Sequence, residues 1–349
     1  MQKTYFVYFT LLLAAILRIY IHCRPDIISC QSADIYQEKG SYYADEIQQH
    51  SAGSIFVRLR NYCQEKAYQY FPSPHSELLL GMTIGIDNLK EVPKFKKMLR
   101  DTGTIHVVVV SGYNVSLVYN MVVKLLGSPY RTRNLILGVF VTLFYALLSG
   151  FEPPVVRSWL MGSIVALGKF YGRKFNVLQV LLLTGLLLII FNPDYLYSLS
   201  FQLSFLATLS LVLFEAPISA RSKKLLKNDF VMSEDLNATV AAQILIWPYL
   251  SFKFGQVSLV SPLINALILW TVPLATVWGG LFLLVSNLGG LPTKIISQLV
   301  FLPLDFFVSL IRFFSGLEFA SINFKLSLAA LLTYYLIVFL IYKKKVKDA

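Results

Sequence analysis

Apolar runs long enough to cross a membrane recur along most of this chain, and short polar loops separate them. Thr104–Leu126 is one such run of about 23 residues, and a bilayer core is roughly 30 Å thick. The middle of this run is polar and contains Ser111, Gly112, Tyr113, Asn114 and Ser116. Polar groups cost free energy in hydrocarbon, so the run is expected to face other helices or a wet cavity. Two interpretations stay open: a helix with a small-residue packing notch, or a pore-lining or gating helix.

The same pattern predicts about ten membrane helices. The first, Tyr5–Ile21, is followed by HCRPD instead of a small-residue cleavage motif, so it is predicted to remain as an anchor. The other helices are predicted at 104–126, 134–149, 155–171, 177–191, 196–214, 237–254, 258–286, 295–314 and 326–342. Pro248 and Pro273 lie in a region with recurrent prolines, which predicts discontinuous helices and a kinked or split span at 258–286.

The segment at 22–103 is the largest polar region. A helical stripe of apolar positions predicts a helix over Ser54–Tyr70, and Ser76 is a predicted N-cap for a short helix after it. Asn88–Arg100 is amphipathic, with four lysines on its polar side. These helices are expected either to lie flat in the membrane interface or to cover a pore mouth. Residues 25–53 have weak periodicity, and their fold is not predicted.

Composition places the chain among membrane proteins. It is 56% hydrophobic and only 14% charged, and its mean hydropathy is +0.62, whereas soluble domains carry about 25% charged residues. The predicted fold class is therefore an all-α polytopic membrane protein. Its formal charge of +12 is expected to be largely a topology signal, which argues against nucleic-acid binding from charge alone.

Loop charge predicts the orientation of the helices. Every second loop is basic, counting from Lys3, and the opposite short loops carry almost no positive charge. Basic loops remain on the cytoplasmic side. Both termini of this multi-pass protein of the cytoplasmic membrane are therefore predicted to be cytoplasmic. The predicted parts are an anchor (1–21), an external segment (22–103), a channel-type domain (104–342) and a basic tail (343–349).

Cysteine and histidine usage points to no metal site. Cys23, Cys30 and Cys63 all fall in the predicted external segment, where a disulfide between two of them is possible in an oxidising compartment. The four histidines form no HxH or HExxH pair. No metal and no cofactor are expected.

GFEPPVVRSWLMG (150–162) is the first motif with special chemistry. Gly150 precedes Pro153 and Pro154, which suit the first turn of a helix because the missing N–H groups would have no partner there. Arg157 then lies about one turn inside the helix. It is interpreted either as a snorkelling arginine at the interface or as a functional arginine that faces a cavity.

YSLSFQLSFLATLS (197–210) is the second motif. Ser200, Ser204 and Thr208 are four residues apart and share one face of a helix, and Gln202 lies nearby. This stripe is expected either to hydrogen-bond between helices or to line a hydrated pathway.

Three segments together resemble the competence domain of the ComEC family of bacterial DNA-uptake channels. They are LLLGMTIGID with the segment that follows it, LLSGFEPPVVRSWLMG and FNPDYLYSLSFQLSFLAT, and they cover roughly residues 76–300. The positions that match the family motifs are His106, Ser111, Gly112, Gly150, Pro153, Arg157, Gln202, Ser204 and Phe205. Asn114 departs from the pattern, since many members have histidine there; the change keeps hydrogen bonding and removes a titratable group.

The resemblance implies a channel for single-stranded DNA in natural transformation. The pathway candidates are His106, Ser111, Gly112, Asn114, Arg157, Gln202 and Ser204. The implied partners are single-stranded DNA, a cytoplasmic helicase-type motor and DNA-receptor proteins, beside the lipid bilayer and a possible second copy of the chain. Members usually carry an oligonucleotide-binding-like domain and a metallo-β-lactamase-like domain; no HxHxDH motif is present here, so no nuclease activity is expected from this chain.

Three other interpretations stay open. The first is a transporter for another anionic polymer or lipid on the same architecture. The second is an intramembrane enzyme, for which Arg157, His106 and Arg312 are the titratable candidates; no catalytic residue is predicted and the chain is not expected to be an enzyme. The third is a degenerate homologue with a structural role in an uptake complex.

Overall fold

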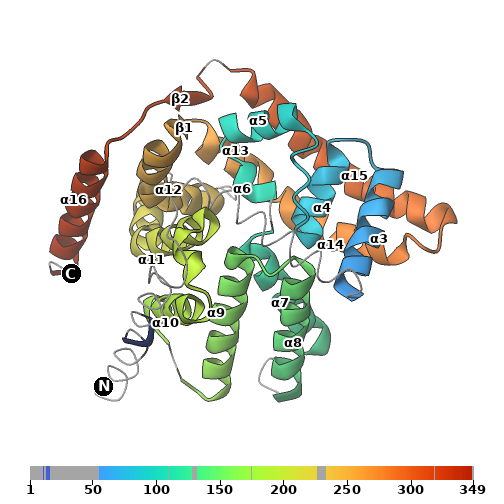
Figure 1. The fold of residues 1–349 in the computed structure, drawn as a ribbon, viewed down its shortest axis with the longest axis horizontal. Helices are drawn as coiled ribbons and strands as arrows, with labels where there is room; N and C mark the ends of the chain where they lie inside the picture. The colour runs from blue at the N-terminus through green and yellow to red at the C-terminus, as the bar shows by residue number, and fades with distance from the viewer. Residues whose placement is uncertain are drawn as a thin grey trace, which may run out of the picture. The chain divides into compact units, whose positions relative to one another are not determined.

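A computed structural model gives the structure of this chain. It describes residues 11, 13–15, 55–108, 110–127, 132–173, 175–225, 233–317 and 319–347. Helices account for nearly all regular structure in these ranges (Figure 1), which confirms the predicted all-α class. The predicted anchor lies outside the described residues, apart from residues 11 and 13–15, and so do residues 25–53.

The chain divides into two compact units. Unit 1 consists of Met1–Tyr62 and Val110–Phe205, and unit 2 of Cys63–Val109 and Leu206–Ala349. The boundaries at Tyr62 and Phe205 fall inside α3 (Ile55–Tyr70) and α11 (Leu199–Leu225). Each unit therefore combines segments that are far apart in the sequence.

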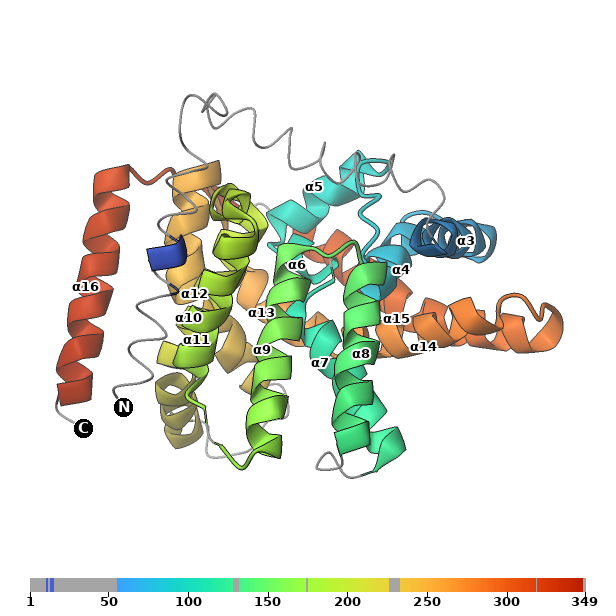
Figure 2. The same cartoon turned by 60° about the horizontal axis from the view of Figure 1, so that its bottom comes forward.

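Unit 1 is built from consecutive apolar helices. They are α7 (Gly112–Leu126), α8 (Thr132–Leu148), α9 (Pro153–Phe170) and α10 (Val177–Phe191), followed by the 3₁₀ turn η1 (Pro193–Tyr197). The first three pack against one another, and α10 packs on α9 (Figures 1 and 2). Close approach of α7 and α8 depends on Gly138, because a Cβ there would lie 2.8 Å from the Tyr119 ring.

The polar run at 104–126 is not one helix. It is divided into α6 (Ile105–Val108) and α7, although its length and composition suit a membrane span. Ser111 has an extended backbone, with φ −106° and ψ 169°, directly before the first residue of α7. Serine and glycine both favour such a break, because the serine side chain competes with helical hydrogen bonds and glycine adds backbone freedom.

Unit 2 contains the remaining helices. They are α4 (His75–Ile84), α5 (Pro93–Asp101), α6, α12 (Ser233–Phe254), α13 (Ser261–Ile268), α14 (Thr271–Val285), α15 (Gly290–Ser315) and α16 (Leu328–Lys347). α14 and α15 pack along each other and α4 packs on both. Phe282 and Phe307 are fully buried in this core with Leu79 and Met82. α4 begins at His75 after Pro74, so the predicted N-cap at Ser76 is wrong: Ser76 lies inside the helix and donates to Glu77.

Two loops of unit 2 pair as short strands that were not predicted. β1 (Gln256–Ser258) and β2 (Ser321–Asn323) are antiparallel, with Val257 opposite Ile322. α5 packs beside β1, and the Gln256 amide donates to Asp101 over 3.0 Å and to Ser321 over 2.8 Å. Loop charge predicts all three segments on the external side, and their association is consistent with that prediction.

The two prolines predicted as helix breaks behave differently. α12 continues through Pro248, so the expected break is absent at this position. A proline cannot donate to the carbonyl four residues earlier, which is that of Ile244; the Tyr334 hydroxyl of α16 donates to this oxygen over 3.0 Å. Pro273 lies in the first turn of α14, and the break comes just before it, where α13 and α14 meet at 43°.

The count of about ten spans is not confirmed. Three helical stretches of the described residues are long and apolar enough to cross a membrane, at Ile105–Leu126, Leu199–Ser222 and Gly290–Ser315, and the bent pair α13–α14 would be a fourth. Shorter apolar helices are present at Thr132–Leu148, Val177–Phe191 and Leu328–Lys343. The basic loop predicted at 215–236 is wrong in part, because α11 extends through Pro217 to Leu225.

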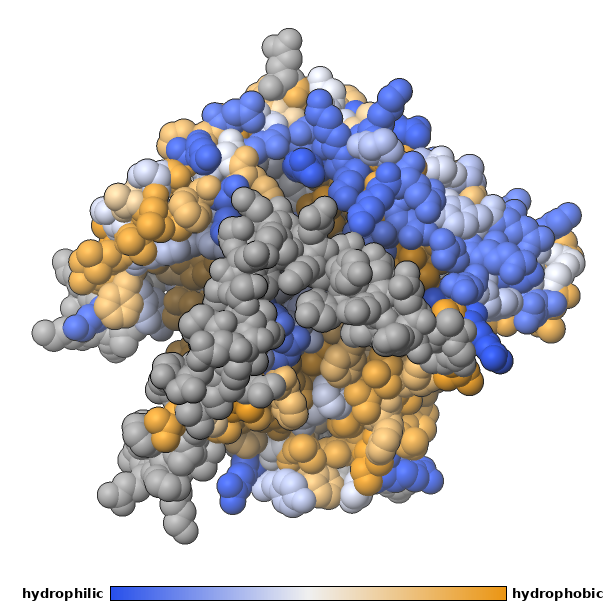
Figure 3. Space-filling view, viewed as in Figure 1, coloured by the Kyte–Doolittle hydropathy of each residue, from blue (hydrophilic) through white to orange (hydrophobic). Residues whose placement is uncertain are grey.

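Large apolar side chains cover much of the surface. In unit 1, Phe140, Phe144 and Leu125 are exposed on α8 and α7, and Figure 3 shows the apolar surface over α8. In unit 2, hydrophilic residues gather over α5 in the same view. Apolar side chains remain in hydrocarbon at no cost, so this surface suits a membrane protein.

Candidate functional site

Three sequence motifs meet in unit 1. The N-terminal ends of α7, α9 and α11 carry Gly112, Arg157 and Gln202, respectively. The Ser158 hydroxyl donates to the Gly112 carbonyl over 2.8 Å, and a Cβ on Gly112 would lie 3.0 Å from the Ser158 Cβ. The small residue thus lets two helix starts touch. The structure places Gly112 and Arg157 close together and brings Arg157 beside Phe205 near the beginning of α11.

The turn between α8 and α9 fixes where Arg157 lies. The Gly150 N–H donates to the Leu147 carbonyl, and the Phe151 N–H donates to the Ala146 carbonyl. This pair of bonds ends a helix when the first of the two donor residues, here Gly150, has a left-handed backbone. Gly150 has φ +85°, and Phe151 also has a positive φ of +58°. That conformation is costly for phenylalanine. Pro153 and Pro154 then start α9 as predicted.

Arg157 is half-buried, and its guanidinium contacts a thioether and an aromatic ring. Its Nη1 lies 3.9 Å from the Met161 sulfur, and its guanidinium carbon lies 5.9 Å from the centre of the Phe205 ring. A Cβ on Gly112 would lie 3.2 Å from its Nη2. A guanidinium over an aromatic face is attracted by the ring quadrupole. The side chain is therefore held between α7, α9 and the first turns of α11.

Polar neighbours extend this site. Asn114 is buried and its side chain lies beside the Tyr145 hydroxyl of α8. The Gln202 amide donates to the Leu196 carbonyl over 2.6 Å, which ties the start of α11 to η1. Ser111 and Ser204 are half-buried on α7 and α11.

Apolar clusters lie around these groups. Val110, Val115, Ala146 and Val155 form one, with Tyr145 and Trp159 packed against it. Val156, Leu188 and Phe201 form the other, with Phe205 and Leu160 at its edge. The candidate side chains thus project from helix starts that pack against these two apolar clusters.

Two predicted residues belong to the other unit. His106 belongs to unit 2, where it is exposed on the short helix α6. Cys63 is buried in α3 as a free thiol, while Cys23 and Cys30 lie outside the described residues. Burial raises the pKa of the Cys63 thiol.

Arg60 is a residue that the sequence did not single out. It projects from α3 toward the Gly150 turn, where a Cβ on Gly150 would lie 2.7 Å from its Nη1. Burial lowers the pKa of Arg60, and the nearby Glu152 carboxylate opposes this effect. Glycine thus suits position 150 for two reasons: the backbone has a positive φ, and the Arg60 guanidinium approaches where a Cβ would lie. From the sequence alone, an arginine on the polar face of a helix is expected to be solvated. Only the folded structure could therefore identify the contact of Arg60 with the Gly150 turn.

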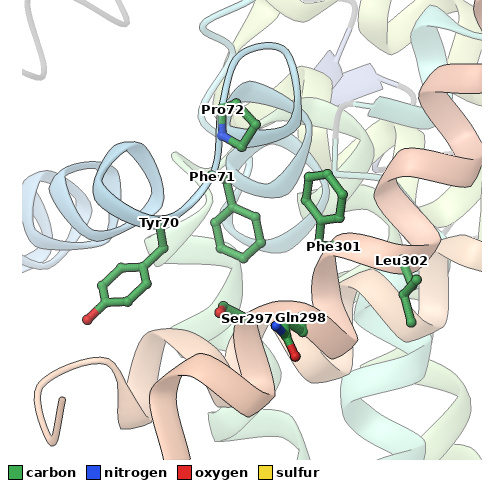
Figure 4. Close-up of a pocket in the computed structure, with 7 residues that line it drawn as sticks. All are labelled: Tyr70, Phe71, Pro72, Ser297, Gln298, Phe301 and Leu302. Carbon is green, nitrogen blue, oxygen red and sulfur yellow. The ribbon is translucent and has the colours of Figure 1, made fainter. Parts of the chain in front are cut away.

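A second group of polar and aromatic residues lies in unit 2. Nε2 of His75 lies 3.1 Å from a carboxylate oxygen of Asp305 on α15, and the His75 ring stacks on Phe301 at 4.7 Å. Beside it is a pocket of about 560 Å³ lined by Tyr70, Phe71, Pro72, Ser297, Gln298, Phe301 and Leu302 (Figure 4). Phe71 and Phe301 project into it from two walls, above Ser297 and Gln298. No three His, Cys, Asp or Glu side chains converge as metal ligands among the residues that the structure describes.

Comparison with known proteins decides the family. The pattern of the Competence protein family matches residues 82–347, which include α9, the start of α11 and all of α15. The chain belongs to this family. The ComEC-type resemblance seen in the motifs is therefore confirmed, and this competence protein is a membrane protein.

Three relatives show how far the similarity extends. An uncharacterized protein of Aquifex aeolicus is 34% identical over 157 residues, covering 44% of this chain and 37% of that protein. ComE operon protein 3 of Bacillus subtilis is 25% identical over 215 residues, or 60% of this chain and 26% of its own length. The uncharacterized protein YcaI of Escherichia coli is 27% identical over 150 residues, or 40% and 20%. The chain thus spans less than two fifths of each relative. No solved structure matches it.

Proposed function

We propose that this competence protein is a multi-pass channel of the cytoplasmic membrane that conducts single-stranded DNA during natural transformation. The observation that carries the proposal is the meeting of the three motif segments around Arg157 in unit 1. Family membership and similarity to ComE operon protein 3 support a role in competence. Both termini are proposed to be cytoplasmic.

A strand that crosses a membrane needs a wet path with small or polar walls and positive charge for its phosphates. Arg157 provides the charge. Its thioether and ring contacts are weak compared with a charge-assisted bond to phosphate, and a guanidinium can bind phosphate through two parallel N–H groups. The contacts to Met161 and Phe205 hold the side chain at the starts of α9 and α11, and a phosphate that reached it would gain the stronger bond.

The small and polar residues of the site shape its walls. Gly112 lets α7 and α9 approach closely, and Ser111, Asn114 and Ser204 supply hydrogen-bonding groups in the same unit. We assign no catalytic step to these residues. A helicase-type motor on the cytoplasmic side would supply the energy, and external receptor proteins would deliver the DNA.

The test is uptake of labelled DNA by cells that lack this gene. Cells complemented with the wild-type chain are expected to recover cytoplasmic DNA entry, whereas deletion cells are expected to retain DNA only outside the membrane. Chain abundance in the membrane is matched by quantitative blotting.

Undiminished cytoplasmic entry in the deletion strain would remove DNA as the substrate. The same strain would then be examined for transfer of another anionic polymer or lipid, the chemistry that the same architecture also suits.

A further inference from the structure

α15 has three distinct faces. At 3.6 residues per turn, one face carries Val300, Leu304, Phe307 and Ile311, all of which are buried. The next face is apolar and exposed, and it carries Ile295, Leu299, Leu302 and Phe306. The third face carries Lys294, Gln298, Asp305, Ser309 and Arg312, which are all exposed. We call these five residues the polar stripe; they fall within a sector of about 60° along the helix.

The position of the polar stripe on a helix that suits a membrane span indicates what the stripe faces. α15 is long and apolar enough to span a bilayer, and its exposed apolar face suits lipid. Charged groups near the bilayer centre cost about 2.5–3.5 kcal/mol each on insertion scales, so they face protein or water. Asp305 lies close to the middle of this helix. The polar stripe is therefore expected to face a hydrated space.

Two pockets of unit 2 are lined in part by α15, and the first of them includes Gln298 of the polar stripe. The aromatic pocket is lined by Gln298 and Phe301 of α15. A second pocket of about 500 Å³ is lined by Ser315 at the end of α15, by Lys97 and Arg100 of α5, and by Asn323 of β2. Leu302 and Ser315 are separated by about 20 Å of helix at 1.5 Å per residue. This length holds several nucleotides, given a rise of about 3.4 Å per nucleotide in stacked DNA.

Charge along this surface favours an anionic ligand. Lys97, Arg100, Lys294 and Arg312 are exposed cations. The carboxylates are Asp305, held by His75 at 3.1 Å, and Asp101, which accepts from Gln256 at 3.0 Å. These four cations outnumber the two carboxylates, and each carboxylate is bonded to a neighbouring side chain. The surface therefore carries an excess of positive charge.

We propose that single-stranded DNA binds along the polar stripe of α15, with phosphates on Lys97, Arg100 and Arg312 and a base in the aromatic pocket beside Phe301. Cations that track the backbone, combined with aromatic rings for the bases, are the usual means of holding a single strand without sequence preference. The inference rests on the proposed function and assigns a second contact surface to the same strand, in unit 2.

The first test places the photo-crosslinking residue p-benzoyl-phenylalanine at neighbouring positions of α15 during uptake of labelled DNA. Gln298 and Ser309 lie on the polar stripe, and Leu299 and Phe306 are matched controls on the exposed apolar face. DNA adducts are expected from the stripe positions and not from the controls. Equal yields from both faces, adducts to a second copy of the chain or to lipid, or no adducts during normal uptake would each overturn the inference and leave the proposed function standing. Uptake that does not depend on the chain at all would overturn both.

The second test measures binding of a fluorescent oligonucleotide to the purified full chain in neutral-lipid nanodiscs. Lys97→Gln with Arg100→Gln is compared with Lys90→Gln with Lys94→Gln, which removes the same charge from exposed residues that do not line the pocket. The first pair is expected to weaken binding about tenfold and to lower the salt slope by about 1.4, since each lost phosphate contact lowers it by about 0.7. Equal losses from the two pairs would identify a general electrostatic attraction and overturn the assigned site.

Discussion

Gly112 lies at a contact between two helix starts of unit 1, those of α7 and α9. A Cβ at this position would lie 3.0 Å from the Ser158 Cβ, which is too close for van der Waals contact without displacement. The hydrogen bond from Ser158 to the Gly112 carbonyl would be displaced with it.

Gly112→Val is therefore expected to destabilise the chain by about 1–3 kcal/mol, the usual cost of overpacking. Gly162→Val is the matched control, since Gly162 lies in α9 with open space around its Cβ position. Thermal unfolding of the purified chain in detergent measures both. Equal melting temperatures for the two variants would contradict the close contact between α7 and α9.

Cys63 offers a chemical test at the same scale. Burial raises the pKa of its thiol, so the reactive thiolate is scarcer at neutral pH than for an ordinary cysteine. In a chain with Cys23→Ser and Cys30→Ser, maleimide is expected to label Cys63 slowly, and faster as the pH rises toward the raised pKa. Denatured chain provides the fast reference. Labelling of the folded chain at the reference rate would place Cys63 on the surface.

At the scale of helices, α12 shows how a proline is tolerated inside a membrane-protein helix. Pro248 leaves the Ile244 carbonyl without its helical donor, and Tyr334 of α16 donates to it instead. Tyr335 donates to the next carbonyl, that of Leu245, over 2.8 Å. One tyrosine of α16 thus supplies the donor that Pro248 lacks, and the next tyrosine bonds to the neighbouring carbonyl.

Tyr334→Phe is expected to lower the free energy of unfolding by about 1 kcal/mol, because it leaves a carbonyl without a donor. In a Pro248→Ala background the helical N–H is restored, so the same substitution is expected to cost much less. Unfolding of the four chains of this double-mutant cycle in detergent gives the coupling energy. A coupling energy of zero would show that the Tyr334 hydroxyl does not compensate for the N–H that Pro248 lacks.

Element boundaries were predictable where the pattern was strong. The apolar stripe at Ser54–Tyr70 became α3, and Pro153 and Pro154 opened α9. The extension of α11 to Leu225 was not predicted, because hydropathy reports which residues prefer hydrocarbon and not where a backbone turns. The strands β1 and β2 were missed because three-residue strands depend on a partner far along the chain.

The candidate site shows the same limit. Arg157 and Gly112 were predictable because an arginine or a polar cluster is unusual in an apolar run. Arg60 and the pair of His75 with Asp305 were not, since each depends on a contact between distant segments. Asp305 lies in a predicted span, yet its partner His75 is the first residue of α4, in the segment predicted to be external.

At the scale of the whole molecule, the predicted topology is open to a direct test. The pairing of β1 with β2 fits two loops on the external side. In a chain without native cysteines, Ser321→Cys is expected to react with a membrane-impermeant maleimide added to intact cells, whereas Arg221→Cys in α11 is expected to react only after permeabilisation. The reverse pattern would invert the topology and place the termini outside.

The most direct test of the central claim is the amount of labelled single-stranded DNA that reaches the cytoplasm when Arg157 is changed at wild-type abundance. The account predicts that Arg157→Gln lowers this amount at least about tenfold, since a charge-assisted contact is worth about 1.5–3 kcal/mol, and that Arg157→Lys retains part of it because the charge is kept. Full uptake with Arg157→Gln would contradict the account, because it would show that the strand does not depend on this cation.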